Sequence, residues 1–138
     1  MLLTRTDTGD TIMLPDDLHW TDKAWSPVVQ TAEWSLTGAL ILDEATKQAG
    51  RPITLESYSG VGGQGGAITQ TVANALIAWS HVSGLTMILN RLGVDYSVTW
   101  RHESGAALSL EPVLFLVNTS GNPDDDPWYS IILRFWEL

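Results

Sequence analysis

This sequence of 138 residues contains no cysteine, which excludes disulfide bonds, thiol nucleophiles and cysteine-based zinc sites. Basic residues are also scarce: two lysines and five scattered arginines stand against sixteen acidic residues, giving a net charge of −9 and a pI near 4.4. A surface that binds nucleic-acid phosphates needs clustered Lys and Arg. We therefore expect neither nucleic-acid binding nor docking on an anionic membrane surface.

Long hydrophobic runs are missing as well. The residues that follow Met1 contain no sustained apolar stretch of the kind found in secretory signals. The most apolar segment, residues 72–89, is interrupted by polar residues such as Asn74 and His81, whereas a membrane span needs roughly 20 largely apolar residues. With 44% hydrophobic residues the chain still has material for a core, and its length predicts a single domain over 1–138.

Most of the chain has the alternating pattern of β-strands. Residues 2–6 and 11–14 flank an Asp-x-Gly turn and predict a hairpin. Period-two alternation predicts further strands over 28–44, 51–56, 85–90, 94–101, 107–117 and 128–138. In the first of these the large apolar residues share one parity: Trp34, Leu36, Leu40 and Leu42. That parity predicts a strand with one buried face.

Only one segment has helical spacing. Apolar residues recur at that spacing over 68–83, and Thr69 or Thr71 is a suitable N-cap. The expected fold is therefore α+β and mainly β: an antiparallel β-sandwich or barrel with one flanking α-helix at about residues 68–83.

Two apolar segments point to extra coverage. No charged residue occurs between Glu56 and Arg91, although an exposed helix normally carries a charged face. We expect a sheet to cover one side of the helix and consider a second chain as the cover of its other side. The last strand, 128–138, is apolar on both faces, which indicates either a central strand or one buried by a partner.

Short motifs that resemble nucleotide-binding or catalytic signatures lack the required context. Residues 60–65 match G-x-G-x-x-G, but a dinucleotide site needs repeated βαβ units and an acidic residue after the next strand, and neither is evident. We interpret 59–66 as a glycine-rich loop. Asp-Thr-Gly at 7–9 matches the active-site motif of aspartic proteases. It lies in the turn of the first predicted hairpin, however, where Asp and Gly are common because they adopt turn conformations readily.

Acidic residues and histidines give no clear metal or catalytic site. The aspartates at 124–126 lack the alternating spacing of a calcium loop, and we expect a solvated turn in the polar loop 118–127. His19, His81 and His102 are well separated along the chain. We expect no enzyme, no cofactor and no metal. This expectation does not cover residues that are distant in the sequence and come together only in the folded chain.

Seven tryptophans are the most unusual feature of the composition. Trp79 and Trp100 fall on the predicted helix and on a predicted strand, so we expect both in the core. Four others lie in loops or at strand ends, where aromatic side chains serve protein interfaces or stack on sugars. With apolar residues of the last strand they form the candidate interface: Trp20, Trp25, Trp128, Ile132, Trp136 and Leu138.

Two short stretches and the order of the elements after them form a recognisable pattern. Residues 34–40 read Trp-Ser-Leu-Thr-Gly-Ala-Leu, and 48–55 read Gln-Ala-Gly-Arg-Pro-Ile-Thr-Leu. A helix with Trp79, a hairpin, a strand through Tyr96 and a closing strand that ends Arg-Phe-Trp-Glu-Leu follow in that order. This pattern, over most of residues 28–138, resembles small tail and baseplate proteins of tailed bacteriophages.

Distal tail and tail-tube proteins share a β-sandwich flanked by one helix, and they assemble as rings that are commonly hexameric. The resemblance therefore implies a structural subunit of the virion that assembles in the host cytoplasm as a homo-oligomeric ring. Its other partners would be tail proteins such as tube, hub and tape measure. It brings no catalytic residue to this chain, which is also too short for the extra carbohydrate-binding domain of some distal tail proteins.

One alternative belongs to a different class of function. Loop and strand-end tryptophans suit a β-sandwich module that binds carbohydrate or a receptor equally well. A sugar that quenches the tryptophan fluorescence would favour the binding module. A neighbouring gene for a tape-measure protein would favour the tail subunit.

Overall fold

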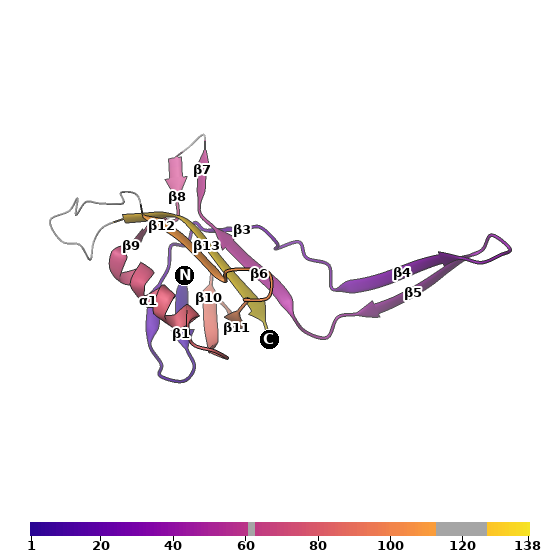
Figure 1. Cartoon of the computed structure of the whole chain (residues 1–138), viewed down its shortest axis with the longest axis horizontal. Helices are drawn as coiled ribbons and strands as arrows, with labels where there is room; N and C mark the ends of the chain where they lie inside the picture. Colours follow the sequence, from indigo (N-terminus) through magenta and orange to yellow (C-terminus); the bar gives the residue numbers. More distant parts are fainter. Residues whose placement is uncertain (61–62, 113–126) are drawn as a thin grey trace.

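The computed structural model describes residues 1–60, 63–112 and 127–138. These residues are mostly strand with one short helix, which confirms the expected α+β, mainly β class (Figure 1). The helix is α1 (Gln70–Ser80), and the strands are β1 (Leu2–Arg5), β2 (Thr11–Met13), β3 (His19–Trp20), β4 (Val28–Trp34), β5 (Leu40–Thr46), β6 (Arg51–Glu56), β7 (Tyr58–Gly60), β8 (Gly63–Gly65), β9 (Ile68–Thr69), β10 (Thr86–Arg91), β11 (Val94–Trp100), β12 (Leu108–Pro112) and β13 (Pro127–Glu137).

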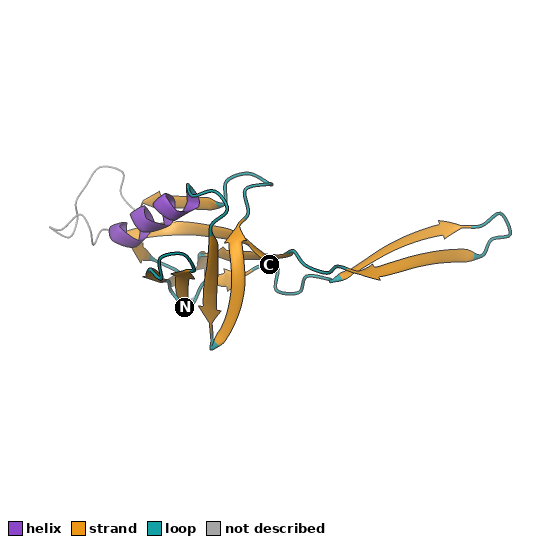
Figure 2. Ribbon diagram, turned by 90° about the horizontal axis from the view of Figure 1, so that it is seen from below, coloured by secondary structure: helices purple, strands orange, loops and turns teal. Residues whose placement is uncertain are grey.

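One antiparallel sheet organises the body of the molecule. Its strands follow the order β2-β1-β10-β11-β13-β6-β3, and both β12 and β9 also pair with β13. The last strand is thus central, with neighbours on both edges, which was one of the two explanations for its apolar residues on both faces. Figures 1 and 2 show this sheet curving around the core, with α1 lying against it.

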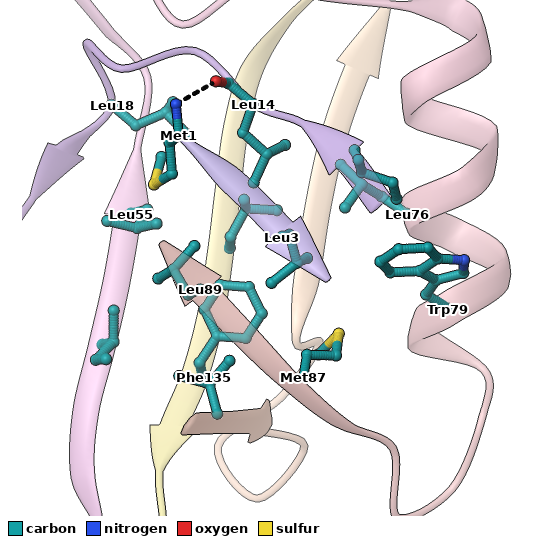
Figure 3. Packing of buried hydrophobic residues seen from close by; sticks show 14 of the residues in the cluster. Met1, Leu3, Leu14, Leu18, Leu55, Leu76, Trp79, Met87, Leu89 and Phe135 are labelled. Atoms are coloured by element: carbon teal, nitrogen blue, oxygen red, sulfur yellow. Dashed lines mark hydrogen bonds between the residues drawn. The ribbon is translucent and has the colours of Figure 1, made fainter. Parts of the chain in front are cut away.

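The core lies where alternate residues of neighbouring strands point to the same side. Leu55 pairs with Leu133, and Ile53 pairs with Phe135, so the apolar parity of β6 meets that of β13. Figure 3 shows Leu3 and Phe135 in this interior. The largest side chains with almost no exposed surface are Leu3, Leu18, Ile53, Leu55, Leu76, Met87, Leu89, Val98, Ile131, Leu133 and Phe135.

Two tryptophans complete this core, as predicted. Trp79 and Trp100 are both buried. The Trp100 ring stacks on that of Phe135 with centroids 4.7 Å apart. The guanidinium carbon of Arg5 lies 5.6 Å from the centroid of the Trp79 ring, so this contact joins β1 to the helix.

The helix is shorter than the predicted 68–83 at both ends. Residues 68–69 form β9, which pairs with β13. Thr69 is the N-cap, and its Oγ1 accepts a hydrogen bond of 3.4 Å from the Val72 N–H. Leu76 points toward the interior near Leu3 (Figure 3). One side of α1 is therefore covered by β2, β9, β12 and β13, and a second chain on the other side stays a prediction.

The sequence prediction for 28–44 was wrong. A single half-buried strand was expected, but the segment forms two strands, β4 and β5, joined by a turn at 35–39. Every residue of both strands is exposed. The alternating pattern was correctly identified as β structure, but its apolar face is not covered by any part of the chain that the structure describes.

Other predicted elements differ less. The hairpins at 2–6/11–14 and 85–90/94–101 are confirmed, as is the strand at 51–56. The glycine-rich stretch 59–66, expected as a loop, contributes strands β7 and β8. Residues 15–27, where no strand was predicted, include the short strand β3. The predicted strand 107–117 is observed over 108–112, while residues 113–126, including the acidic run at 124–126, lie outside the described residues.

Candidate assembly surface

The β4–β5 hairpin, residues 28–46, extends from the body as a two-stranded arm. Figures 1 and 2 show it from two directions, and in both it points away from the sheet and the helix. All residues of its two seven-residue strands are exposed. Isolated two-stranded hairpins are marginally stable in water, because they bury little apolar surface. We refer to residues 28–46 as the arm.

The end of the arm is a tight turn specified by small polar residues. The N–H of Gly38 donates to the carbonyl of Ser35 at 2.9 Å, and the N–H of Ser35 donates to the carbonyl of Ala39 at 2.9 Å. The Ser35 hydroxyl also accepts a 3.0 Å hydrogen bond from the Ala39 N–H. Gly38 has a φ of 82°, a left-handed conformation that glycine adopts without a steric penalty.

The base of the arm is fastened by contacts just outside its strands. The Lys47 N–H donates a 2.7 Å hydrogen bond to the Pro27 carbonyl, which extends the pairing by one step. The Lys47 ammonium lies 4.7 Å from the centroid of the Trp25 ring, a cation–π contact. The Ser26 hydroxyl accepts a 3.3 Å hydrogen bond from the Val28 N–H.

Strand register gives the arm one apolar face near its tip. Trp34 pairs with Leu40, and Ala32 pairs with Leu42, so their side chains share a face. Trp34 is 73% exposed, and the two leucines are about half exposed at 47% and 49%. Leu36, also fully exposed, stands in the turn beside them. We define the arm patch by these five residues: Ala32, Trp34, Leu36, Leu40 and Leu42.

The opposite face of the arm carries two acidic residues beside exposed apolar ones. Glu33 and Asp43 belong to the other parity of the strands, as do Val29 and Ile41, which are 46% and 50% exposed. Glu44 lies on the side of the arm patch but nearer the base, where it accepts a hydrogen bond from the Gln30 side-chain amide. Residues 28–46 contain no Lys, Arg or His. The arm thus combines the uncharged, apolar arm patch with a net negative charge, and exposed apolar patches with polar surroundings are typical of protein interaction surfaces.

Trp20, the first of the predicted interface residues, lies in the core. It is 8% exposed, and its Nε1–H donates a 2.7 Å hydrogen bond to Asp22. Its ring meets that of Tyr96 edge to face, with centroids 5.4 Å apart. The guanidinium carbons of Arg51 and Arg91 lie 4.6 Å and 5.8 Å from its centroid. This indole fastens β3 to the sheet and offers little surface to a partner.

The other predicted interface residues are spread over the molecule. Trp25 is half-buried at the base of the arm. Ile132 and Trp136 are half-buried on the face of β13 opposite the core, where the Arg101 guanidinium lies 5.3 Å from the Trp136 centroid. Leu138 is 61% exposed. Trp128 pairs through its backbone with Ile68 and Pro112. These residues do not form one cluster with the arm patch, and their role in an interface stays a prediction.

The arm patch itself was not among the predicted interface residues, although its pattern was visible in the sequence. Trp34, Leu40 and Leu42 were recognised as one face of a strand. That face was assigned to the core because alternation normally reports burial by the same chain. The signal that could have separated the two cases is Ser-Leu-Thr-Gly at 35–38, which is a turn sequence in the middle of the supposed strand.

The motifs examined for chemistry have structural roles where they are described. Asp7 and Gly9 lie in the β1–β2 turn, and Arg5 donates two hydrogen bonds to the Asp7 carboxylate at 2.9 and 2.6 Å. These hydrogen bonds lower the pKa of Asp7. In the G-x-G-x-x-G segment at 60–65, Gly60 ends β7 and Gly63–Gly65 form β8, which β9 separates from α1; residues 61–62 lie outside the described residues.

The described ranges contain neither a cluster of metal-binding side chains nor a helix that could span a membrane. Among residues 1–60, 63–112 and 127–138, no three His, Asp or Glu side chains gather as metal ligands. Within the same ranges, α1 is too short and too polar to span a membrane.

The arm is thus the feature of this molecule that most clearly lacks a partner. Its strands expose a continuous apolar surface at one end of an otherwise well-packed domain. Comparison with known proteins adds no family: no protein-family model, curated protein or solved structure matches this chain.

Proposed function

We propose that this protein is a structural subunit of a bacteriophage tail or baseplate, similar in plan to distal tail and tail-tube proteins. In this function it self-associates into a ring and contacts other tail proteins, such as tube, hub and tape-measure proteins. It works by forming contacts and catalyses no reaction. Its location would be the virion, after assembly in the host cytoplasm.

The observation that carries this proposal is the exposed arm. Fully burying a Leu or comparable apolar side chain contributes about 1.5–3 kcal/mol relative to leaving it in water. In a single chain Trp34 and Leu36 lose most of that contribution, and Leu40 and Leu42 lose about half of it. A projecting hairpin with this surface is costly for a monomer but useful in a subunit whose neighbours cover it.

Two further properties support an assembly function. The mainly β domain with one helix agrees with the plan shared by the proteins that the sequence resembles. The β13 face opposite the core presents half-buried Ile132 and Trp136 and ends in exposed Leu138, and it offers a second surface for neighbours.

The experiment that tests this function is the absolute mass of the purified protein. Light scattering over a range of concentrations, with negative-stain images of each peak, should show closed rings of several copies or rings stacked into tubes. A protein that stays monomeric at every concentration, alone and with tail-tube or tape-measure proteins of the same phage, would contradict it.

The carbohydrate- or receptor-binding alternative has one observation in its favour, the exposed indole of Trp34. Sugar sites combine such a ring with polar groups that bond the hydroxyls. The neighbours of Trp34 are instead Leu40, with which it pairs, and Leu36, which stands two residues along the chain in the turn. This setting favours a protein partner. Quenching of tryptophan fluorescence by a panel of sugars, lost in Trp34→Ala, would favour the alternative.

A further inference from the structure

A shallow apolar hollow lies on the body at the junction of β2, β9 and the start of α1. Its volume is about 470 Å³, and its lining includes Met13, Leu14, Pro15, Ala67, Ile68 and Val72. No lining residue is charged. Met13 is 69% exposed at its edge, and methionine adapts its shape readily to an incoming side chain. We refer to this feature as the hollow.

The arm and the hollow lie at opposite ends of the molecule. In Figures 1 and 2 the arm extends from the side of the body away from β9 and α1. Its strands of seven residues span roughly 20 Å at about 3.4 Å per residue, directed outward. The arm of a given copy therefore cannot reach the hollow of that same copy.

We propose that the arm patch of one copy docks in the hollow of a second copy, with the Trp34 indole as its anchor. This inference rests on the proposed self-association and names the contact that produces it. A hollow of this size is in the range of small-ligand pockets, so an indole ring fits easily. Tryptophan is also enriched among the residues that dominate the binding energy of interfaces.

The charges of the two surfaces are compatible with this pairing. The whole chain carries a net charge of −9, and the arm contributes Glu33, Asp43 and Glu44 with no basic residue. Two copies therefore repel in general. Residues 57–90, which supply Ala67, Ile68 and Val72, contain no Asp, Glu, Lys or Arg. The arm patch and the lining of the hollow are both uncharged, so their contact buries no unpaired charge. Of the two aspartates that follow Pro15, Asp16 is paired with the N-terminal ammonium.

The symmetry of this contact differs from that of a simple dimer. The arm patch and the hollow are different surfaces, so each copy uses one as donor and the other as acceptor. Such a head-to-tail contact adds one copy after another. The copies form a closed ring if the rotation from each copy to the next adds up to a full turn, and an open row if it does not. An arm-to-arm contact would instead stop at two copies.

The test compares variants that damage only the arm or only the hollow. Trp34→Asp disables the arm, and Met13→Asp disables the hollow; both residues are exposed. Val94→Asp, at the exposed start of β11, is the matched control. Light scattering should show that each of the first two raises the concentration for half-assembly about tenfold or more, whereas the control assembles like wild type. Circular dichroism verifies the folding of each, and Ala67→Asp replaces Met13→Asp if that variant misfolds.

Mixing the two defective variants gives the decisive result. The Trp34→Asp variant keeps an intact hollow, and the Met13→Asp variant keeps an intact arm. The arm of the second can therefore dock in the hollow of the first. The product is a 1:1 dimer, which cannot grow because its two remaining surfaces are defective. A hollow variant that still assembles like wild type overturns the docking site but leaves the proposed self-association intact. A wild-type protein that never associates overturns both.

A cross-link tests the same contact directly. The chain has no cysteine, so Trp34→Cys and Met13→Cys introduce the only thiols. Mixed and oxidised by oxidised glutathione, which accepts the two electrons, they should form a disulfide-linked dimer. Val94→Cys with Met13→Cys is the control. Equal cross-linking in both mixtures would contradict the placement of Trp34 in the hollow.

Discussion

Trp34 and Leu76 show how differently two large apolar residues contribute in this protein. Leu76 of α1 has no exposed surface and packs in the core, whereas Trp34 is 73% exposed on the arm. Truncating a buried leucine removes transfer free energy and leaves a cavity. Truncating an exposed side chain leaves the folded monomer nearly unchanged. The two residues therefore separate stability from assembly.

We expect Leu76→Ala to lower the free energy of unfolding by about 2–5 kcal/mol. Trp34→Ala should change it by less than about 0.5 kcal/mol and yet weaken self-association. Urea unfolding of both variants at low protein concentration measures the first quantity, and light scattering measures the second. A large loss of monomer stability in Trp34→Ala would show that the arm folds back on the body in solution.

The Arg5–Asp7 pair makes a prediction about pH. The guanidinium of Arg5 holds the pKa of Asp7 below its ordinary value in the folded protein. The stabilising contribution of this carboxylate is therefore complete above the pKa of the unfolded chain, roughly pH 4, and is lost as the pH falls through the lower folded value. Chemical-shift titration of Asp7 should show the lowered pKa, and Arg5→Gln should restore the ordinary one.

Among the elements, the arm is the one that the body does not need. Pro27 and Lys47 are already joined by a hydrogen bond at its base, so a Gly-Gly link can replace residues 28–46 without moving either end far. Because no core residue lies on the arm, we expect the shortened chain to keep its secondary structure and to melt within a few degrees of the full chain.

This shortened chain should also remain monomeric at concentrations where the full chain assembles. Thermal unfolding by circular dichroism and light scattering supply the two measurements. A control deletion elsewhere in the chain, Gly62–Gly65, removes part of the glycine-rich segment and leaves the arm. Assembly by the armless chain would place the main contact elsewhere, with the β13 face as the next candidate.

Strands and turns that are marked by residues close together in the sequence could be predicted. Whether a residue or strand face is buried could not be predicted, because burial depends on distant parts of the chain. The β10–β11 hairpin and β6 each carry alternation and a turn signal, and both were located. The arm carries the same alternation, but whether an apolar face is buried depends on what lies against it. Trp20 shows the reverse case. The sequence placed it in a loop and in an interface, but it is buried because β3 pairs with β6 and its ring meets that of Tyr96.

At the scale of the whole molecule, net charge opposes assembly and apolar contact favours it. Copies with a net charge of −9 repel over the Debye length, which shrinks from about 30 Å at 0.01 M salt to about 3 Å at 1 M. We therefore expect the concentration for half-assembly to fall as NaCl rises. Sedimentation velocity at several salt concentrations measures this. Dissociation by salt would indicate that ion pairs, and not the arm patch, hold the copies together.

The placement of the arm at one end of the body and the hollow at the other gives every copy a direction. In an unfinished row the two terminal copies are chemically different, because one has a free arm patch and the other has a free hollow. A second protein that imitates only one of these surfaces could thus cap one terminus and leave the other free to grow. Polarity of this kind would let a ring or tube distinguish the component that starts it from the component that finishes it.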